Sequence, residues 1–168
     1  ALPICVEWAA RTNWLPLATG GQKIEFADDA EILVQIAAPD FDPREKVILS
    51  ASARESVGAL PQSNVQFLSR EFSANAARFE IESDASSVLV LAQTFHRNWR
   101  ATINGTAAPV LRANHAFQAI AVPAGRSIVK LEYRDEKFSL GLRISAFAWA
   151  GWLFAWVRPH LKRRDGVA

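Results

Sequence analysis

The feature that most constrains this 168-residue chain is an apolar stretch near its C-terminal end. Across residues 138–157 the only charged residue is Arg143, and basic residues follow from Arg158 onward. A helix needs about 20 mostly apolar residues to cross a bilayer, and Trp, Lys and Arg gather where such helices leave it. The alternative is a long amphipathic helix packed on the rest of the protein, with Arg143 in solvent. We predict a transmembrane helix over residues 138–158 and a basic cytoplasmic tail over residues 159–168.

Charge and composition exclude several classes of protein. The formal net charge is +2 at pH 7. The last eleven residues sum to +3 and the rest of the chain to −1, so the rest offers no basic field for nucleic acid. Half of the residues are hydrophobic, which excludes a disordered chain. Cys5 is the single cysteine, so neither an intrachain disulfide nor a thiolate metal cluster can form. Because the sequence has no methionine and no signal peptide, we expect a C-terminal piece of a longer membrane protein.

From residue 64 onward the pattern is typical of β-strands. In residues 78–82 apolar and charged side chains alternate, which gives one buried and one wet face. Residues 88–92 are apolar without a break, as in a strand covered on both sides. Asn104-Gly105 and the Pro123 to Gly125 segment predict tight turns. We therefore predict a mainly β fold with an antiparallel, jelly-roll-like β-sandwich over residues 64–137.

Residues 1–63 are expected to be an α/β lead-in to this sandwich. Asp28 and Asp29 precede an apolar-periodic run that Pro39 ends, which predicts a short helix with favourable charge at its N-terminus. The expected order is then lead-in, extracytoplasmic sandwich, transmembrane helix and tail.

The sequence shows no known catalytic motif. It lacks a Gly-rich phosphate loop, an HExxH helix and a GxSxG turn, and its histidines lack the spacing of metal ligands. We therefore expect no catalytic residue, metal or cofactor in this chain.

A polar and aromatic cluster flanks the Asn104-Gly105 turn instead. Forked Arg donors, amides and aromatic faces are what sugars or phosphates would use. The same pattern also suits a Trp99 in the core with solvated arginines beside it. The candidate ligand contacts are Trp99, Arg100, Arg112, Asn114 and His115. The turn residues with an expected structural role are Asn104, Gly105, Pro123 and Gly125.

Residues 98–134, NWRATINGTAAPVLRANHAFQAIAVPAGRSIVKLEYR, resemble the C-terminal domain of the YfhO-like family of bacterial membrane proteins. The resemblance rests on Trp99, the Asn104-Gly105 hairpin, the Arg112-Ala-Asn114 return, the Pro123-Ala-Gly125 turn and Tyr133. The Phe41-Asp42-Pro43-Arg44 segment is similar to the family as well. His115 stands where the family often has an aromatic residue.

The resemblance implies a role in the bacterial cell envelope. Members of this family resemble lipid-linked-sugar glycosyltransferases with many membrane spans, and their catalytic carboxylates are expected in an early extracytoplasmic loop that is absent here. The chain is then expected to be a non-catalytic, extracytoplasmic accessory domain of a protein in the bacterial plasma membrane. Its expected partners are the lipid bilayer, the remainder of the parent protein, and cell-envelope glycan or lipid-linked sugar.

Two alternatives belong to other classes. The chain could be a structural or interaction module that docks on the parent membrane domain or on a partner protein, which an exposed apolar patch would favour. An independent hydrolase would require two carboxylates facing each other in one pocket.

Overall fold

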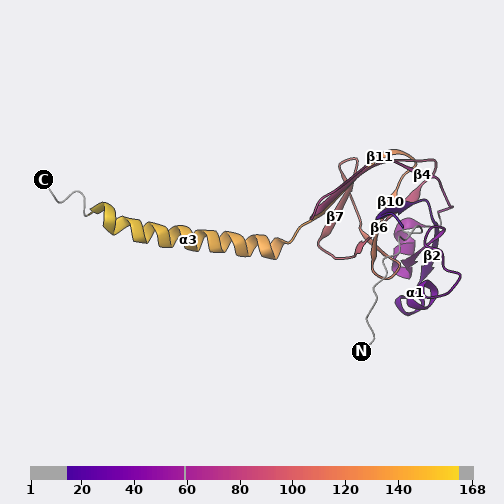
Figure 1. The fold of residues 1–168 in the computed structure, drawn as a ribbon, viewed down its shortest axis with the longest axis horizontal. Helices are drawn as coiled ribbons and strands as arrows, with labels where there is room; N and C mark the ends of the chain where they lie inside the picture. The colour runs from indigo at the N-terminus through magenta and orange to yellow at the C-terminus, as the bar shows by residue number, and fades with distance from the viewer. Residues whose placement is uncertain (1–14, 59, 163–168) are drawn as a thin grey trace, which may run out of the picture. The chain divides into compact units, whose positions relative to one another are not determined.

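The computed structural model describes residues 15–58 and 60–162 of the chain (Figure 1). The chain divides into two compact units, Ala1–Tyr133 and Arg134–Ala168. Cys5 and residues 163–168 of the expected basic tail lie outside the described residues. The first unit is mainly β, as the period-two patterning of its sequence predicts.

One sheet combines strands from distant parts of the sequence. Within the described residues it has six strands, and three of them come from the segment expected as a lead-in. All neighbouring strands are antiparallel except β2 and β3, which run parallel. In spatial order the strands are β1 (Ala18–Gly20), β6 (Ser87–Thr94), β10 (Phe117–Val122), β9 (Leu111–Ala113), β3 (Lys46–Ser50) and β2 (Lys23–Ala27).

The second sheet is antiparallel throughout its five described strands. In spatial order they are β4 (Val65–Phe72), β5 (Ala76–Ser83), β11 (Gly125–Tyr133), β7 (Trp99–Ile103) and β8 (Thr106–Ala108). Its outer face is charged. There Arg126 of β11 donates from Nε to Glu80 of β5 at 2.7 Å. This face is the wet side that the alternation in residues 78–82 predicts.

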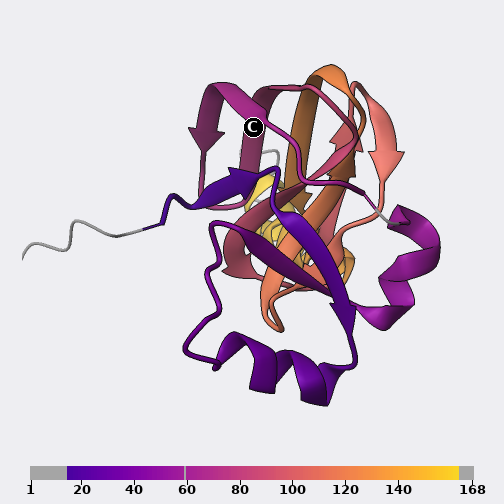
Figure 2. The ribbon, with the colours of Figure 1, turned by 90° about the vertical axis from the view of Figure 1, so that its right-hand side faces the viewer.

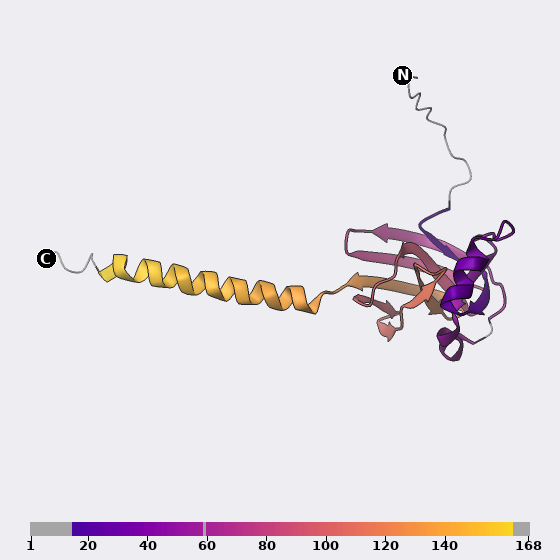
Figure 3. The ribbon, with the colours of Figure 1, turned by 90° about the horizontal axis from the view of Figure 1, so that it is seen from below.

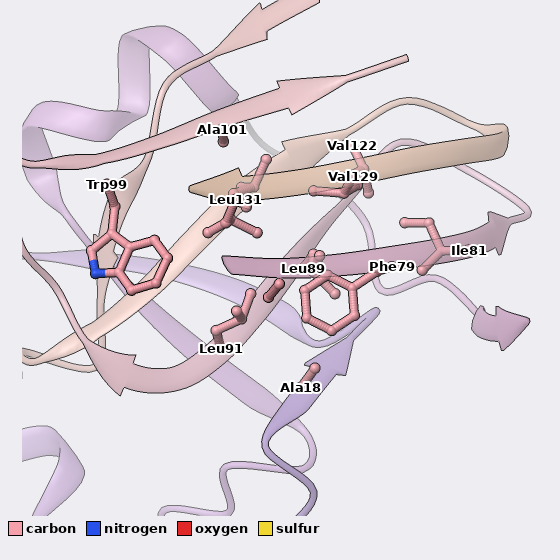
Figure 4. Close-up of a cluster of buried hydrophobic side chains, with 12 residues drawn as sticks. Ala18, Phe79, Ile81, Leu89, Leu91, Trp99, Ala101, Val122, Val129 and Leu131 are labelled. Atoms are coloured by element: carbon pink, nitrogen blue, oxygen red, sulfur yellow. The ribbon is translucent and has the colours of Figure 1, made fainter. Parts of the chain in front are cut away.

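The inner faces of the two sheets share one apolar core. Phe79 of β5 is fully buried and meets Phe72 edge to face, with ring centroids 5.3 Å apart. Figure 4 shows side chains of both sheets pointing into this layer. Each fully buried Leu, Ile, Val or Phe contributes roughly 1.5 to 3 kcal/mol. The buried members are Ala18, Ala77, Phe79, Ile81, Leu89, Leu91, Trp99, Ala101, Ile120, Val122, Val129 and Leu131.

Short helices cover both faces of β3. Ile32 of α1 (Asp29–Ile36) packs on Ile48, whereas Ala53 of η1 (Ala51–Ala53) packs with Leu49. Because successive residues of a strand point to opposite faces, α1 and the η1 turn lie on opposite sides of β3. Figure 2 shows α1 and α2 (Arg54–Val57) on different sides of the strands.

Strand β6, which lies between β1 and β10, is also covered on both faces. Leu89 and Leu91 belong to the inter-sheet core, and Val88 and Val90 belong to the cluster that contains Ala53. This double burial confirms the prediction from the apolar run for residues 88–91, whereas Ala92 at its end is exposed. The predicted short helix is confirmed as well, because α1 starts directly after Asp28.

As far as the structure describes it, to residue 162, the second unit consists of one helix, α3 (Glu136–Lys162), which Figure 3 shows without a break. Asp135 caps its start, since its Oδ1 accepts a hydrogen bond from the backbone N–H of Phe138 at 3.0 Å. Large apolar side chains along the helix are exposed, and Trp149 meets Trp152 edge to face at 5.6 Å.

The prediction of a transmembrane helix over residues 138–158 is wrong on this structure. Among the helices of the described residues, none is both long and apolar enough to cross a membrane. At 27 residues α3 has the length, so the shortfall is in apolar character. A scarcity of charged residues alone does not make a helix apolar enough to cross a bilayer.

Two leucines in the first unit provide a matched test of the core. Leu131 is fully buried between the sheets, whereas Leu33 of α1 is 47% exposed. We expect Leu131→Ala to lower the free energy of unfolding by about 2 to 5 kcal/mol, because it leaves a cavity. Leu33→Ala should change it by about 0.5 kcal/mol or less. Chemical denaturation of the two variants measures both values, and equal losses would contradict this assignment of the core.

Candidate functional site

The predicted ligand contacts lie on two different sheets. Trp99 and Arg100 begin β7 in the five-stranded sheet. Arg112 lies on β9 of the six-stranded sheet, and Asn114 and His115 form the turn from β9 to β10. The two groups therefore have separate surroundings.

Trp99 is a core residue. Only 7% of its surface is exposed, and its ring meets Tyr133 edge to face at a centroid distance of 5.5 Å. Tyr133 also contacts the ring of His96 at 5.7 Å and accepts a hydrogen bond from Asn98 Nδ2 at 3.3 Å. An indole buried in this way offers no open face to a ligand, so the core interpretation of Trp99 applies.

Arg100 belongs to the surface of the same sheet. Its Nη1 donates to the backbone carbonyl of Arg97 at 3.1 Å, and its partner across the strands is Glu132 of β11. It is an exposed residue of the charged outer face.

Two turn asparagines hold neighbouring strands in the same way. The backbone N–H of Asn114 donates to the carbonyl of Ile48 at 2.8 Å, and the N–H of Ile48 donates to Asn114 Oδ1 at 2.8 Å. Asn104 makes the same pair with Ile128, at 2.9 Å and 2.8 Å. Each asparagine thus ties the turn of its own hairpin to a neighbouring strand outside that hairpin. Asn114 is bonded to β3, and Asn104 is bonded to β11.

Both hairpins turn through left-handed backbone. Asn104 and Gly105 have φ of 51° and 87°, and Asn114 and His115 have φ of 44° and 68°. Glycine adopts this conformation without strain, whereas histidine does so at a cost. His115 is half-buried, and its Nδ1 is enclosed without a hydrogen-bond partner among the described residues. Gly125, with φ of 87°, provides the same freedom after Pro123 at the start of β11.

The role of Asn114 can be tested by removing its side-chain oxygen. Asn114→Ala leaves the N–H of Ile48 without its acceptor and puts alanine at positive φ. We expect a loss of about 1 to 3 kcal/mol in the free energy of unfolding.

Asn114→Asp is the matched control, because it retains the acceptor and tolerates the left-handed region. It should recover most of the stability in thermal or chemical denaturation. If the Ala and Asp variants were equally stable, the link to β3 would contribute nothing.

The best candidate site is an open hollow of about 460 Å³ near the end of β3. Its volume is within the range of about 300 to 1,000 Å³ that is usual for small-ligand sites. Three serines, one arginine and one phenylalanine line it together with aliphatic residues. The lining residues are Ser50, Ser52, Ala53, Ser56, Phe95, Val110, Leu111 and Arg112.

The local fold explains why these residues meet. Ser50 ends β3 and lies across from Arg112 on β9, in the register that pairs Leu49 with Ala113. Ser52 and Ser56 follow in the η1–α2 segment, where a spacing of four residues puts them on one helical face. The hydroxyls of Ser50 and Ser52 lie 3.1 Å apart.

The charge in the hollow is already compensated. Arg112 Nη2 donates to Asp29 Oδ2 in an ion pair between β9 and the first turn of α1. Arg54, on the neighbouring α2, has its guanidinium carbon over the ring of Phe26 at 5.1 Å from the ring centre. Among the described residues, no carboxylate lines the hollow.

Sequence reasoning found one of these residues and missed the others. Arg112 lines the hollow, whereas Trp99, Arg100, Asn114 and His115 do not. The serines were missed because the segment after β3 has the composition of an exposed loop. Their spacing at 50, 52 and 56, directly after a buried strand, was the available signal. In the described part of the chain, no group of three His, Cys, Asp or Glu side chains could hold a metal ion.

A second, smaller hollow lies at the β4–β5 hairpin. Its volume is about 260 Å³, and Phe72 is its aromatic wall. Arg78 lies between Glu71 and Lys130 on the adjacent strands, so charges of both signs surround it. It lacks the group of hydroxyls found in the first hollow.

Comparison with known proteins gives the family. Residues 56–145 match the family model described as bacterial membrane protein YfhO. This match runs from within α2 into α3 and covers more than half of the chain, whereas β1, β2, β3 and α1 precede it. The chain therefore belongs to this family of bacterial membrane proteins. No curated protein and no solved structure matches the chain.

Proposed function

We propose that the β unit is a non-catalytic accessory domain of a membrane glycosyltransferase-like protein, and that it contacts cell-envelope glycan or lipid-linked sugar. The hollow lined by Ser50, Ser52, Ser56, Phe95 and Arg112 is the observation that supports this proposal most directly. Sugar rings present hydroxyls along their edges and C–H groups on their faces. Hydroxyl and guanidinium groups beside an aromatic ring complement both.

The proposal assigns contact and not catalysis to this unit. Glycoside hydrolysis requires two carboxyl groups on either side of the bond, and the described lining of the hollow contains none. Membership of a membrane-protein family supports the presence of a parent protein that could carry the chemistry. The β unit would then present or hold a glycan near the reacting part of that protein.

A titration with matched arginine variants tests this function. We expect soluble cell-wall glycan fragments to shift the NMR signals of Ser50, Ser52 and Arg112 in the labelled full chain. Arg112→Ala should weaken binding at least about tenfold, as expected from the loss of charge-assisted hydrogen bonds.

Arg126→Ala is the control, because Arg126 is also an ion-paired surface arginine but belongs to the other sheet. It should leave the affinity unchanged. If glycan fragments at millimolar concentration shifted no NMR signal of the hollow, the proposed contact with glycan would be wrong.

We also propose that the β unit lies on the extracytoplasmic side of the bacterial plasma membrane. Cell-envelope glycans are on that side, so contact with them requires it. A cytoplasmic C-terminus depended on the transmembrane helix and is not proposed.

A pair of alanine-to-cysteine variants in the parent protein tests this placement, with Cys5 replaced by serine. Ala124 is exposed in the turn before β11, whereas Ala119 is fully buried on β10. In intact spheroplasts a membrane-impermeant maleimide should label Ala124→Cys and leave Ala119→Cys unlabelled. Labelling of Ala124→Cys only after lysis would place the β unit in the cytoplasm.

A second candidate function is an interaction module that docks on the parent membrane domain or on a partner protein. The exposed apolar side chains of α3 favour it, with Phe147 at 78% and Phe154 at 67% exposure. A surface with many large exposed apolar side chains is usually covered by another element or a partner. In this case replacing exposed apolar side chains of α3, and not those of the hollow, would abolish docking on the parent membrane domain or the partner protein.

A further inference from the structure

We infer that the hollow selects an uncharged, polyhydroxylated ring over the same ring carrying a phosphate. This inference rests on the proposed contact with glycan and specifies the class of sugar that the site accepts. It follows from the ion pair of Arg112, from the three serines and from the apolar residues that line the same hollow.

Arg112 is the one charged side chain among the described residues that line the hollow, and it is already paired with Asp29. An anionic ligand would have to share this guanidinium with the carboxylate or displace it. Asp29 also lies in the first turn of α1, where the helix dipole stabilises a negative charge. The ligand would therefore compete with an anion that is already in place.

The pairing leaves Arg112 able to bind neutral acceptors. A guanidinium has five N–H donors in a planar fork, and the bond to Asp29 uses Nη2. The bond to Asp29 occupies one nitrogen of the fork, and the side chain as a whole is 35% exposed. Ring hydroxyl oxygens can accept from these donors without displacing Asp29.

The serines favour the same class of ligand. A hydroxyl both donates and accepts, which suits another hydroxyl. Ser50 and Ser52 lie within hydrogen-bond distance of each other, so they form a local pair that a ring hydroxyl can join. Phe95 and Val110 provide the apolar wall for the C–H groups of a ring.

Methyl glucoside, methyl galactoside, glucose 1-phosphate and inorganic phosphate separate the possibilities by NMR titration of the full chain. Each should be tested at about 20 mM and about 300 mM salt. We expect at least one neutral glycoside to shift the signals of Ser50, Ser52 and Arg112. Its affinity should change by less than about twofold between the two salt concentrations, because no net charge is neutralised. Glucose 1-phosphate should bind at least about threefold more weakly.

Tighter binding of glucose 1-phosphate or phosphate, lost at high salt, would overturn the inference and leave the proposed glycan contact intact. If neither these ligands nor the larger glycan fragments shifted the signals, the proposed function and the inference would both fail. Binding of the larger fragments alone, with no preference between neutral and phosphorylated forms, would overturn the inference only.

A substitution that frees Arg112 provides a second test. Asp29→Asn removes the competing carboxylate and retains a polar side chain at the start of α1. It should raise the affinity for glucose 1-phosphate at least about threefold relative to that for the neutral glycosides, and make the affinity for glucose 1-phosphate salt-dependent.

Glu80→Gln is the matched control, since it frees Arg126 on the other sheet in the same way. It should change neither affinity. If Asp29→Asn also left glucose 1-phosphate binding unchanged, Asp29 would not set the charge preference and the inference would be wrong.

Discussion

The fold depends on the apolar layer between its two sheets. Alternate residues of β5, β7 and β11 on one side, and of β1, β6 and β10 on the other, bury their side chains in one continuous cluster. Burial of this kind is the main favourable term in folding, and it fixes register, because a shift by one residue would expose the whole set. The strands that carry the candidate site, β9 and β3, extend the six-stranded sheet beyond this layer.

The β9–β3 side of the six-stranded sheet holds the residues of the candidate site in place. β9 and β3 continue the sheet beyond the strands of the inter-sheet core, and α1 and η1 cover the two faces of β3. Asn114 joins the β9–β10 turn to β3 through two hydrogen bonds. Arg112 is thereby held on β9 between Ser50 on β3 and Asp29 on α1. The hollow lies where the end of β3, the η1–α2 segment and β9 meet.

The sequence predicted the β character, the short helix and the tight turns, because each has a local signal. The Asn104-Gly105 dipeptide, the alternation in residues 78–82 and the acidic start of α1 can be recognised without knowledge of the fold. It could not predict that β1, β2 and β3 join the sheet of β6 and β10, since those pairings are set by distant contacts. For the same reason Trp99 and Arg112, which flank one hairpin in the sequence, lie on different sheets. The serines of the hollow have no local signal beyond their spacing.

The C-terminal helix shows the opposite limitation. The position of this helix was predictable from the long apolar stretch. Whether a helix can cross a bilayer depends on the transfer free energies of all its residues into the hydrocarbon, added together. Scarcity of charge is only one part of that sum. The chain belongs to a family of bacterial membrane proteins, and its own described helices include none that could cross a membrane.

The most direct measurement of glycan contact is a crystal structure of the chain soaked with a neutral glycoside. A sugar ring should occupy the hollow, with its hydroxyls on Ser50, Ser52 and Arg112, its face toward Phe95, and the Arg112–Asp29 pair intact. A hollow that contained only water at saturating glycoside, or a ring bound elsewhere on the β unit, would contradict this assignment of the site.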